Sequence, residues 1–104
     1  MPPKKNRLSK KDFSLISKKK IIRGSFFDIS IIEKEGLPSF KVSCVVSKKT
    51  AKRAVDRNKM KRKIYNLFME HKNELKPNFY IIYPKREVLY TKYDNLNSEL
   101  KNIL

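Results

Sequence analysis

The sequence predicts an α+β fold, a small two-layer sandwich in which helices pack on a mostly antiparallel sheet with one parallel crossover. Segments with the alternation of strands, at 26–32 and 39–46, are followed by a long segment of helical periodicity. A continuous apolar run at 79–83 comes after that helix, as expected when a parallel crossover leads into an interior strand. The 104 residues are enough for one modest core but not for two, so we expect a single domain over 1–104.

The N-terminal part is expected to contribute an arm and a short helix. Residues 1–8 are basic and proline-containing, which predicts a flexible basic arm. Ser9 followed by Asp12 resembles a capping box and predicts a short helix that ends near Lys18. Residues 18–25 are basic and include a glycine, so we expect a short strand or extended connection followed by a turn.

The two alternating segments predict half-buried strands, because successive side chains of a strand point to opposite faces. Residues 33–38 between them have the composition of a turn, so we expect the two strands to pair as an antiparallel hairpin. The side chains expected on the core face are those of Phe27, Ile29, Ile31, Phe40, Val42, Cys44 and Val46. The opposite face is expected to carry Phe26, Asp28, Ser30, Lys41, Ser43 and Val45.

The helical segment is predicted to begin at Asp56, whose carboxylate can accept from the free amides of the first turn. An apolar stripe at helical spacing is expected to face the core, and it comprises Met60, Ile64, Leu67 and Phe68. The other faces are expected to meet water or a partner, and they carry Asn58, Lys59, Arg62, Lys63, Tyr65 and Asn66.

The C-terminal part is expected to supply the last strand and a final helix. The strand at 79–83 is ended by Pro84. Thr91 with Asp94 is predicted to open a helix whose apolar stripe consists of Leu96, Leu100, Ile103 and Leu104. The predicted order is therefore α-β-β-α-β-α, with room for an extra short strand near Ile21.

The charge of the chain points to a nucleic-acid partner. Lys and Arg number 26 against 10 Asp and Glu, a net charge of +16. In the segment 48–63 the only acid is Asp56, while the basic residues are Lys48, Lys49, Lys52, Arg53, Arg57, Lys59, Lys61, Arg62 and Lys63. A face that serves solubility alone usually mixes both signs, whereas so many like charges repel one another unless a polyanion neutralises them. We therefore predict an RNA- or DNA-binding domain with salt-sensitive affinity.

The residues give little support to other classes of function. No apolar run approaches the ~20 residues of a membrane-spanning helix, and the start lacks the apolar segment of a secretory signal, so we expect a cytoplasmic protein with no membrane partner. Cys44 and His71 are each the only residue of their kind, which excludes an internal disulfide and a clustered metal site. We expect Cys44 in the core, His71 as a cation at a helix end, and no catalytic residues in the protein.

Residues 46–49 spell Val-Ser-Lys-Lys, and residues 54–62 spell Ala-Val-Asp-Arg-Asn-Lys-Met-Lys-Arg. These stretches closely resemble the protein subunit of bacterial ribonuclease P, which has a Val-Ser-Lys-Lys strand end followed by Ala-Val-x-Arg-Asn-Arg-x-Lys-Arg on a helix. The resemblance extends upstream to 6–8 and 12–13, and downstream to the strand at Phe79 and the final Leu-rich helix. It covers nearly the whole chain, in order.

The resemblance implies a fold whose strand-helix-strand crossover is left-handed, against the usual rule. It implies the protein component of a ribonucleoprotein that removes the 5′ leader of precursor tRNA, with the catalytic centre and its magnesium ions in the RNA subunit. No metal or cofactor is expected on the protein alone, and no DNA partner. The residues implied to bind the RNA subunit are Lys48, Lys49, Lys52, Arg53, Arg57, Asn58, Lys59, Lys61 and Arg62. A groove over the sheet is implied to bind the leader of precursor tRNA through Phe13, Phe26, Ser30, Lys41 and Ser43, by stacking and charge neutralisation.

Several positions depart from the family pattern. Lys59 stands in place of an arginine, which loses bidentate phosphate recognition there. The other departures are Lys41 and Ser43 in place of an Arg-x-Gly pattern, Ser17 in place of a groove aromatic, and Tyr65 in place of a frequent arginine. These departures weaken the assignment of individual leader contacts, but they do not weaken the resemblance to the family.

Two alternatives share this charge and size. A ribosomal or other structural rRNA-binding protein would also lack catalytic groups, but it needs no open aromatic-bearing groove beside its basic helix. A DNA-binding regulator that uses 56–72 as a recognition helix would need a preceding helix, whereas a strand precedes this one.

Overall fold

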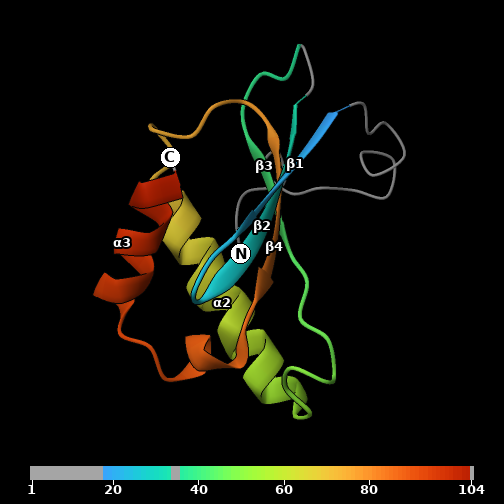
Figure 1. Ribbon diagram of the computed structural model, residues 1–104, viewed down its shortest axis with the longest axis vertical. Coiled ribbons are helices and arrows are strands. Elements are labelled where there is room, and N and C mark those ends of the chain that lie inside the picture. Colours follow the sequence, from blue (N-terminus) through green and yellow to red (C-terminus); the bar gives the residue numbers. More distant parts are fainter. Residues whose placement is uncertain (1–17, 34–35, 104) are drawn as a thin grey trace.

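The computed structural model describes residues 18–33 and 36–103, which form a mixed four-stranded sheet with two helices on one face (Figure 1). The strands are β1 (Lys18–Arg23), β2 (Phe27–Glu33), β3 (Lys41–Cys44) and β4 (Phe79–Pro84), in the spatial order β1-β2-β4-β3. Only β3 and β4 pair in parallel; the other pairs are antiparallel. The predicted α+β class, the parallel crossover and the extra strand near Ile21 are confirmed.

The predicted hairpin between the two alternating segments is wrong. β2 and β3 do not pair, because β4 lies between them: Ile29 of β2 is opposite Ile82, and Ile82 is also the partner of Cys44 of β3. β4 is apolar on both faces over most of its length, so it is best buried in the interior of the sheet, where a hairpin of β2 and β3 would have left it at an edge. The hairpin that does form joins β1 and β2 through the bend at 24–26.

The first of the two helices starts earlier than predicted, and the second starts later. α2 spans Ala54–Glu70, with Arg53 at the N-cap and no side-chain cap, so Asp56 lies in the first turn rather than at the cap. Its carboxylate still favours the positive end of the helix. α3 spans Tyr93–Ile103, and the Thr91 hydroxyl donates to the Glu87 carbonyl instead of capping that helix. A short 3-10 helix, η2 (Arg86–Leu89), was not predicted.

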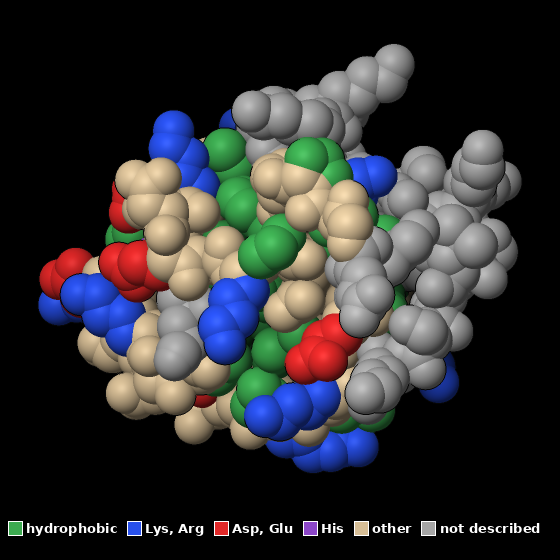
Figure 2. All heavy atoms as spheres, turned by 90° about the horizontal axis from the view of Figure 1, so that it is seen from above, with side chains coloured by type: hydrophobic (Ala, Val, Ile, Leu, Met, Phe, Trp, Pro, Cys, Tyr) green, Lys and Arg blue, Asp and Glu red, His purple; other side chains and the backbone are tan. Residues whose placement is uncertain are grey.

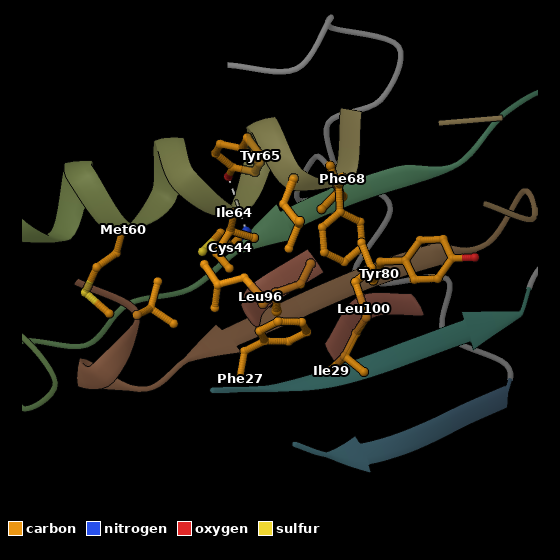
Figure 3. Close-up of a cluster of buried hydrophobic side chains, with 14 of the residues drawn as sticks. Phe27, Ile29, Cys44, Met60, Ile64, Tyr65, Phe68, Tyr80, Leu96 and Leu100 are labelled. Atoms are coloured by element: carbon orange, nitrogen blue, oxygen red, sulfur yellow. Dashed lines mark hydrogen bonds between the residues drawn. The ribbon is translucent and has the colours of Figure 1, made fainter. Parts of the chain in front are cut away.

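The main core lies between the sheet and the two helices (Figure 3). The predicted stripe of α2 is confirmed, since its members are fully buried, as are Leu96 and Leu100 of α3. The Phe68 ring lies 6.0 Å from the Tyr80 ring of β4. Tyr65 was expected to face outward, but it is buried, and its hydroxyl accepts a hydrogen bond of 3.2 Å from the Cys44 backbone N–H (Figure 3). A tyrosine can bury its ring in this way because its hydroxyl has a partner.

The other face of the sheet, which we call the outer face, holds a second small core. Its buried members are Ile32, Phe79 and Ile81, with Leu37 packed against them. The alternation of β2 therefore buries residues on both faces. Residues 1–17, 34–35 and 104 lie outside the described part of the structure, and with them the predicted arm, the first helix and Leu104. Within the described part, no helix is both long and apolar enough to cross a bilayer.

Candidate nucleic-acid interface

The loop between β3 and α2 is a structured turn that presents two lysines. The Thr50 N–H donates to the Ser47 carbonyl (3.1 Å) and to the Ser47 hydroxyl (3.2 Å), and the Ala51 N–H donates to the same carbonyl. These bonds close the chain around Lys48 and Lys49, which form the exposed tip. The lysines are therefore displayed on a defined backbone rather than on a loose loop.

Arg57 connects this loop to α2. Its Nη1 donates to the carbonyls of Ala51 (2.9 Å) and Lys52 (2.7 Å), and the side chain is half-buried. The sequence predicted Arg57 as an outward contact to RNA, but part of its hydrogen-bonding capacity serves the loop. A guanidinium has five N–H donors, so the remaining donors can still reach a phosphate.

The residues predicted to bind an RNA subunit do come together, on the loop and the first half of α2. We call them the basic surface: Lys48, Lys49, Lys52, Arg53, Arg57, Asn58, Lys59, Lys61 and Arg62. All are exposed except Arg57 and Lys61, which are half-buried. Among the described residues, the ion pairs found join other groups, so this positive charge is not neutralised within that part of the chain. Such a concentration of cations attracts a polyanion and binds it by counterion release.

Positive charge is not confined to the basic surface. On the end of the molecule shown in Figure 2, Lys and Arg side chains lie at several places around the margin and also nearer the centre, among hydrophobic side chains and some Asp and Glu side chains. The field of the whole chain therefore supports the approach of a large polyanion from more than one side.

Lys63 has a structural role that its sequence position did not reveal. Its Nζ donates to the carbonyls of Val88 (2.8 Å) and Thr91 (2.6 Å), so it holds η2 and the residues just after it against α2. The pKa of Lys63 is lowered, first by partial burial and then by the positive charge of Lys59. The prediction that Lys63 is simply an outward cation is therefore wrong.

The outer face contains only some of the predicted leader contacts. Lys41 and Ser43 lie on it and are half-buried, and the Lys41 ammonium is 5.9 Å from the centre of the Phe79 ring. Ser30 also lies on this face, but it is only 2% exposed. Phe13 lies outside the described residues.

Phe26 is not on the outer face. It precedes β2, in the bend, and it packs against the main core on the helix side, so strand alternation does not extend back to it. The aromatic residue that does emerge on the outer face is Tyr83 of β4, which is 40% exposed and opposite Asp28 in the sheet. The continuous apolar run at 79–83 predicted an interior strand, and no polar residue in that run marked Tyr83 as its exposed member.

Glu99 of α3 fixes the bend that leads into β2. Its carboxylate accepts from the backbone N–H groups of Ser25, Phe26 (3.0 Å) and Phe27 (3.3 Å). Gly24 allows this close approach, because a Cβ there would lie 2.5 Å from the Phe27 carbonyl oxygen and 2.8 Å from the Glu99 carboxylate. The bend and the last helix are thus held together.

Cys44 and His71 take part in packing rather than in a site. Cys44 is buried, and burial raises the pKa of its thiol to about 12. His71 ends α2 and is also buried, with Nδ1 3.2 Å from the Glu74 carboxylate and Nε2 in contact with the Asn97 side-chain oxygen. Its expected place at a helix end is confirmed. Within 18–33 and 36–103, no three His, Cys, Asp or Glu residues gather as a metal site would need.

Comparison with known proteins shows similarity over the whole length of the chain. The sequence model of the family described as Ribonuclease P matches residues 1–104. The ribonuclease P protein component of a Pseudanabaena species is 33% identical over 107 aligned positions, which cover 100% of this chain and 92% of that protein. Among solved structures, the RNase P protein of Thermotoga maritima matches with a TM-score of 0.78 and 25% identity, covering 94% of each chain. A mutant RNase P protein of Staphylococcus aureus matches with a TM-score of 0.79 and 26% identity, covering 95% of this chain and 85% of that one.

Proposed function

Because this chain belongs to the ribonuclease P protein family, we propose that it holds the RNA subunit with the basic surface and the 5′ leader of precursor tRNA with the outer face. The family supplies the protein component of ribonuclease P, the endoribonuclease that processes the 5′ end of tRNA. Association with the ribonuclease P RNA follows from this membership, and the alternative of a structural ribosomal protein is not favoured.

The basic surface supports the assignment to the RNA subunit. Its cations lie on a hydrogen-bonded loop and on one regular helix, so their spacing is set before RNA binds. A preorganised array loses less side-chain and loop entropy on binding than a flexible one. Phosphate contacts from such an array position a partner without reading its sequence. That is what a protein needs in order to hold one large folded RNA.

The outer face supports the assignment to the leader. Lys41 supplies a cation, Ser43 supplies a hydroxyl, and Tyr83 supplies an exposed ring at the end of β4. A single strand without fixed sequence is commonly held by backbone charge neutralisation together with stacking on aromatic rings. Lys41 and Tyr83 provide one element of each kind on the same face. Ser30 is only 2% exposed, so its hydroxyl is not available to bind the leader.

Catalysis is assigned to the RNA subunit. The family resemblance implies that magnesium ions act there, and the protein contributes binding and orientation of the two RNAs. We also propose that the protein works in the cytoplasm.

The test is cleavage of precursor tRNA by a bacterial ribonuclease P RNA at low magnesium, with and without this chain. The proposal expects the chain to increase cleavage under these conditions, and the double variant Arg53→Ala/Arg62→Ala to lose most of that increase. The matched control is Lys72→Ala/Lys101→Ala, which removes the same charge from exposed positions outside the basic surface. Equal loss in both double variants would mean that net charge alone acts, and no increase with the wild-type chain would refute the proposal.

A further inference from the structure

A hollow lies between the middle of α2 and η2, at the C-terminal end of the family motif, to which Lys59 and Arg62 belong. Figure 1 shows η2 beside α2, and the hollow is lined by Lys59, Arg62, Lys63 and Asn66 of α2 and by Leu89 of η2. Its volume is about 380 Å³, within the ~300–1,000 Å³ typical of sites for small ligands. We call it the α2–η2 hollow.

The wall of the hollow is fixed by hydrogen bonds. Lys63 reaches across and donates to the carbonyls of Val88 and Thr91, on either side of Leu89 and Tyr90. Within the wall, the Val88 N–H donates to the Lys85 carbonyl and the Tyr90 N–H to the Glu87 carbonyl, each over 3.0 Å. The shape of the hollow therefore does not depend on a ligand to order it.

The groups that face the hollow have unused binding capacity. Within the described part of the chain, no hydrogen bond or ion pair engages the side chains of Lys59, Arg62 or Asn66. Arg62 and Lys59 offer charge suited to a phosphate, and the Asn66 amide can both donate and accept. Leu89 adds an apolar surface on the opposite wall.

Tyr90 provides an independent observation. It follows Leu89 directly and is 78% exposed, the most exposed of the large hydrophobic side chains in the described residues. Tyr90 is next in the chain to Leu89 of the wall, and an aromatic ring exposed to water is suited to stacking on a base. The backbone of Tyr90, though not its ring, is held by the hydrogen bond from its N–H to the Glu87 carbonyl.

We propose that the α2–η2 hollow binds one unpaired nucleotide of the RNA subunit, with its phosphate at Lys59 and Arg62 and its base against Asn66, Leu89 and Tyr90. This inference rests on the proposed function and extends it, because it adds base recognition to a surface otherwise made of phosphate contacts. The hollow shares the face of α2 that carries Lys59 and Arg62 of the basic surface, and it lies on the helix side of the sheet rather than on the outer face. The RNA subunit is therefore a better occupant than the leader.

The first experiment measures the affinity of the full chain for the ribonuclease P RNA over a range of salt concentrations. Asn66→Ala and Tyr90→Ala should each weaken binding by about tenfold, with the salt dependence unchanged, because neither residue neutralises a phosphate. Arg62→Ala should weaken binding and reduce the salt slope by about one. The matched control is Asn73→Ala in the loop after α2, which removes the same amide from an exposed position and should bind the RNA subunit as the wild type does.

The second experiment locates the contact. Cys44 is buried with a raised thiol pKa, so a thiol introduced by Asn66→Cys or Tyr83→Cys can be labelled selectively with a photo-crosslinker. The label at position 66 should crosslink to the RNA subunit at one unpaired nucleotide, and the label at 83 should not.

The proposal is overturned if Asn66→Ala and Tyr90→Ala both bind within twofold of the wild type, or if the label at 66 reaches only precursor tRNA. If the wild-type chain fails to bind the RNA subunit at all, the proposed function itself fails. If the wild type, Asn66→Ala and Tyr90→Ala all bind the RNA subunit normally, only the assignment of a nucleotide to the α2–η2 hollow fails.

Discussion

The Arg57 Nη1 atom lies 2.9 Å from the Ala51 carbonyl oxygen, so an arginine of the family motif is bonded to the loop that precedes its own helix. The same atom donates to the next carbonyl, that of Lys52. Two carbonyls of an otherwise irregular segment are thereby tied to the first turns of α2. The arginine organises the basic surface as well as belonging to it.

Arg57→Ala should therefore lower the free energy of unfolding by about 1–2 kcal/mol, because carbonyls bonded to a charged donor lose their partner. Arg62→Ala should change it by less than about 0.5 kcal/mol, since Arg62 is exposed. Urea unfolding of the two variants checks this difference. If both variants unfold at the wild-type midpoint, the bonds of Arg57 do not hold the loop in solution.

Lys63→Ala should destabilise the protein by about 1 kcal/mol, because the carbonyls of Val88 and Thr91 lose a charged donor. Lys59→Ala, one turn earlier on an exposed position, is the matched control and should be close to neutral. Hydrogen exchange should also show faster opening of 86–91 in Lys63→Ala alone. Equal protection of that segment in both variants would contradict the role assigned to Lys63.

Cys44 should make the protein less stable at high pH. Burial raises the pKa of the native thiol to about 12, so above the ordinary thiol pKa of 9.0 the unfolded chain loses a proton that the native state keeps. The contribution of Cys44 to stability is therefore complete below about pH 9 and falls as the pH rises toward 12. The measurement is the difference in unfolding free energy between wild type and Cys44→Ala, taken at several pH values. That difference should shrink with rising pH, and a constant difference would show that the thiol is not buried in this way.

On the outer face, Tyr83→Ala and Lys41→Ala should weaken binding of precursor tRNA to the holoenzyme but leave binding of mature tRNA unchanged. The loss of Tyr83 should cost ~1–3 kcal/mol if one base stacks on it. Asn73→Ala, at an exposed position in the loop after α2, is the control and should bind both tRNAs as the wild type does. An equal loss of affinity for precursor and mature tRNA would refute the assignment of the leader to the outer face.

The sequence predicted those features that depend on local periodicity. The stripe of α2 was correctly phased, and the apolar run at 79–83 correctly predicted an interior strand. The pairing of β2 with β3 was wrong, because alternation says which face a residue occupies but not which strand lies beside it.

The sequence predicted which residues form the candidate site, but it did not predict their hydrogen-bond partners. The basic surface assembled as expected, whereas the bonds of Arg57 and Lys63 run to backbone carbonyls that no side-chain pattern marks. Phe26 was assigned to the wrong face because the strand begins one residue later. The hydrogen bonds of Arg57 and Lys63 and the position of Phe26 all depend on the path of the backbone, which the pattern of side chains does not specify.

The position of β4 between β2 and β3 also governs how a nascent chain can fold. During translation β2 and β3 are synthesised first, but neither reaches β4 until residues 79–84 have left the ribosome. Until then β3 has no strand to pair with, and β2 has only β1. The incomplete sheet has open edges, which are prone to pairing with other chains. The segment between β3 and β4 has an excess of positive charge, and the mutual repulsion of like-charged chains opposes such pairing until the last strand arrives.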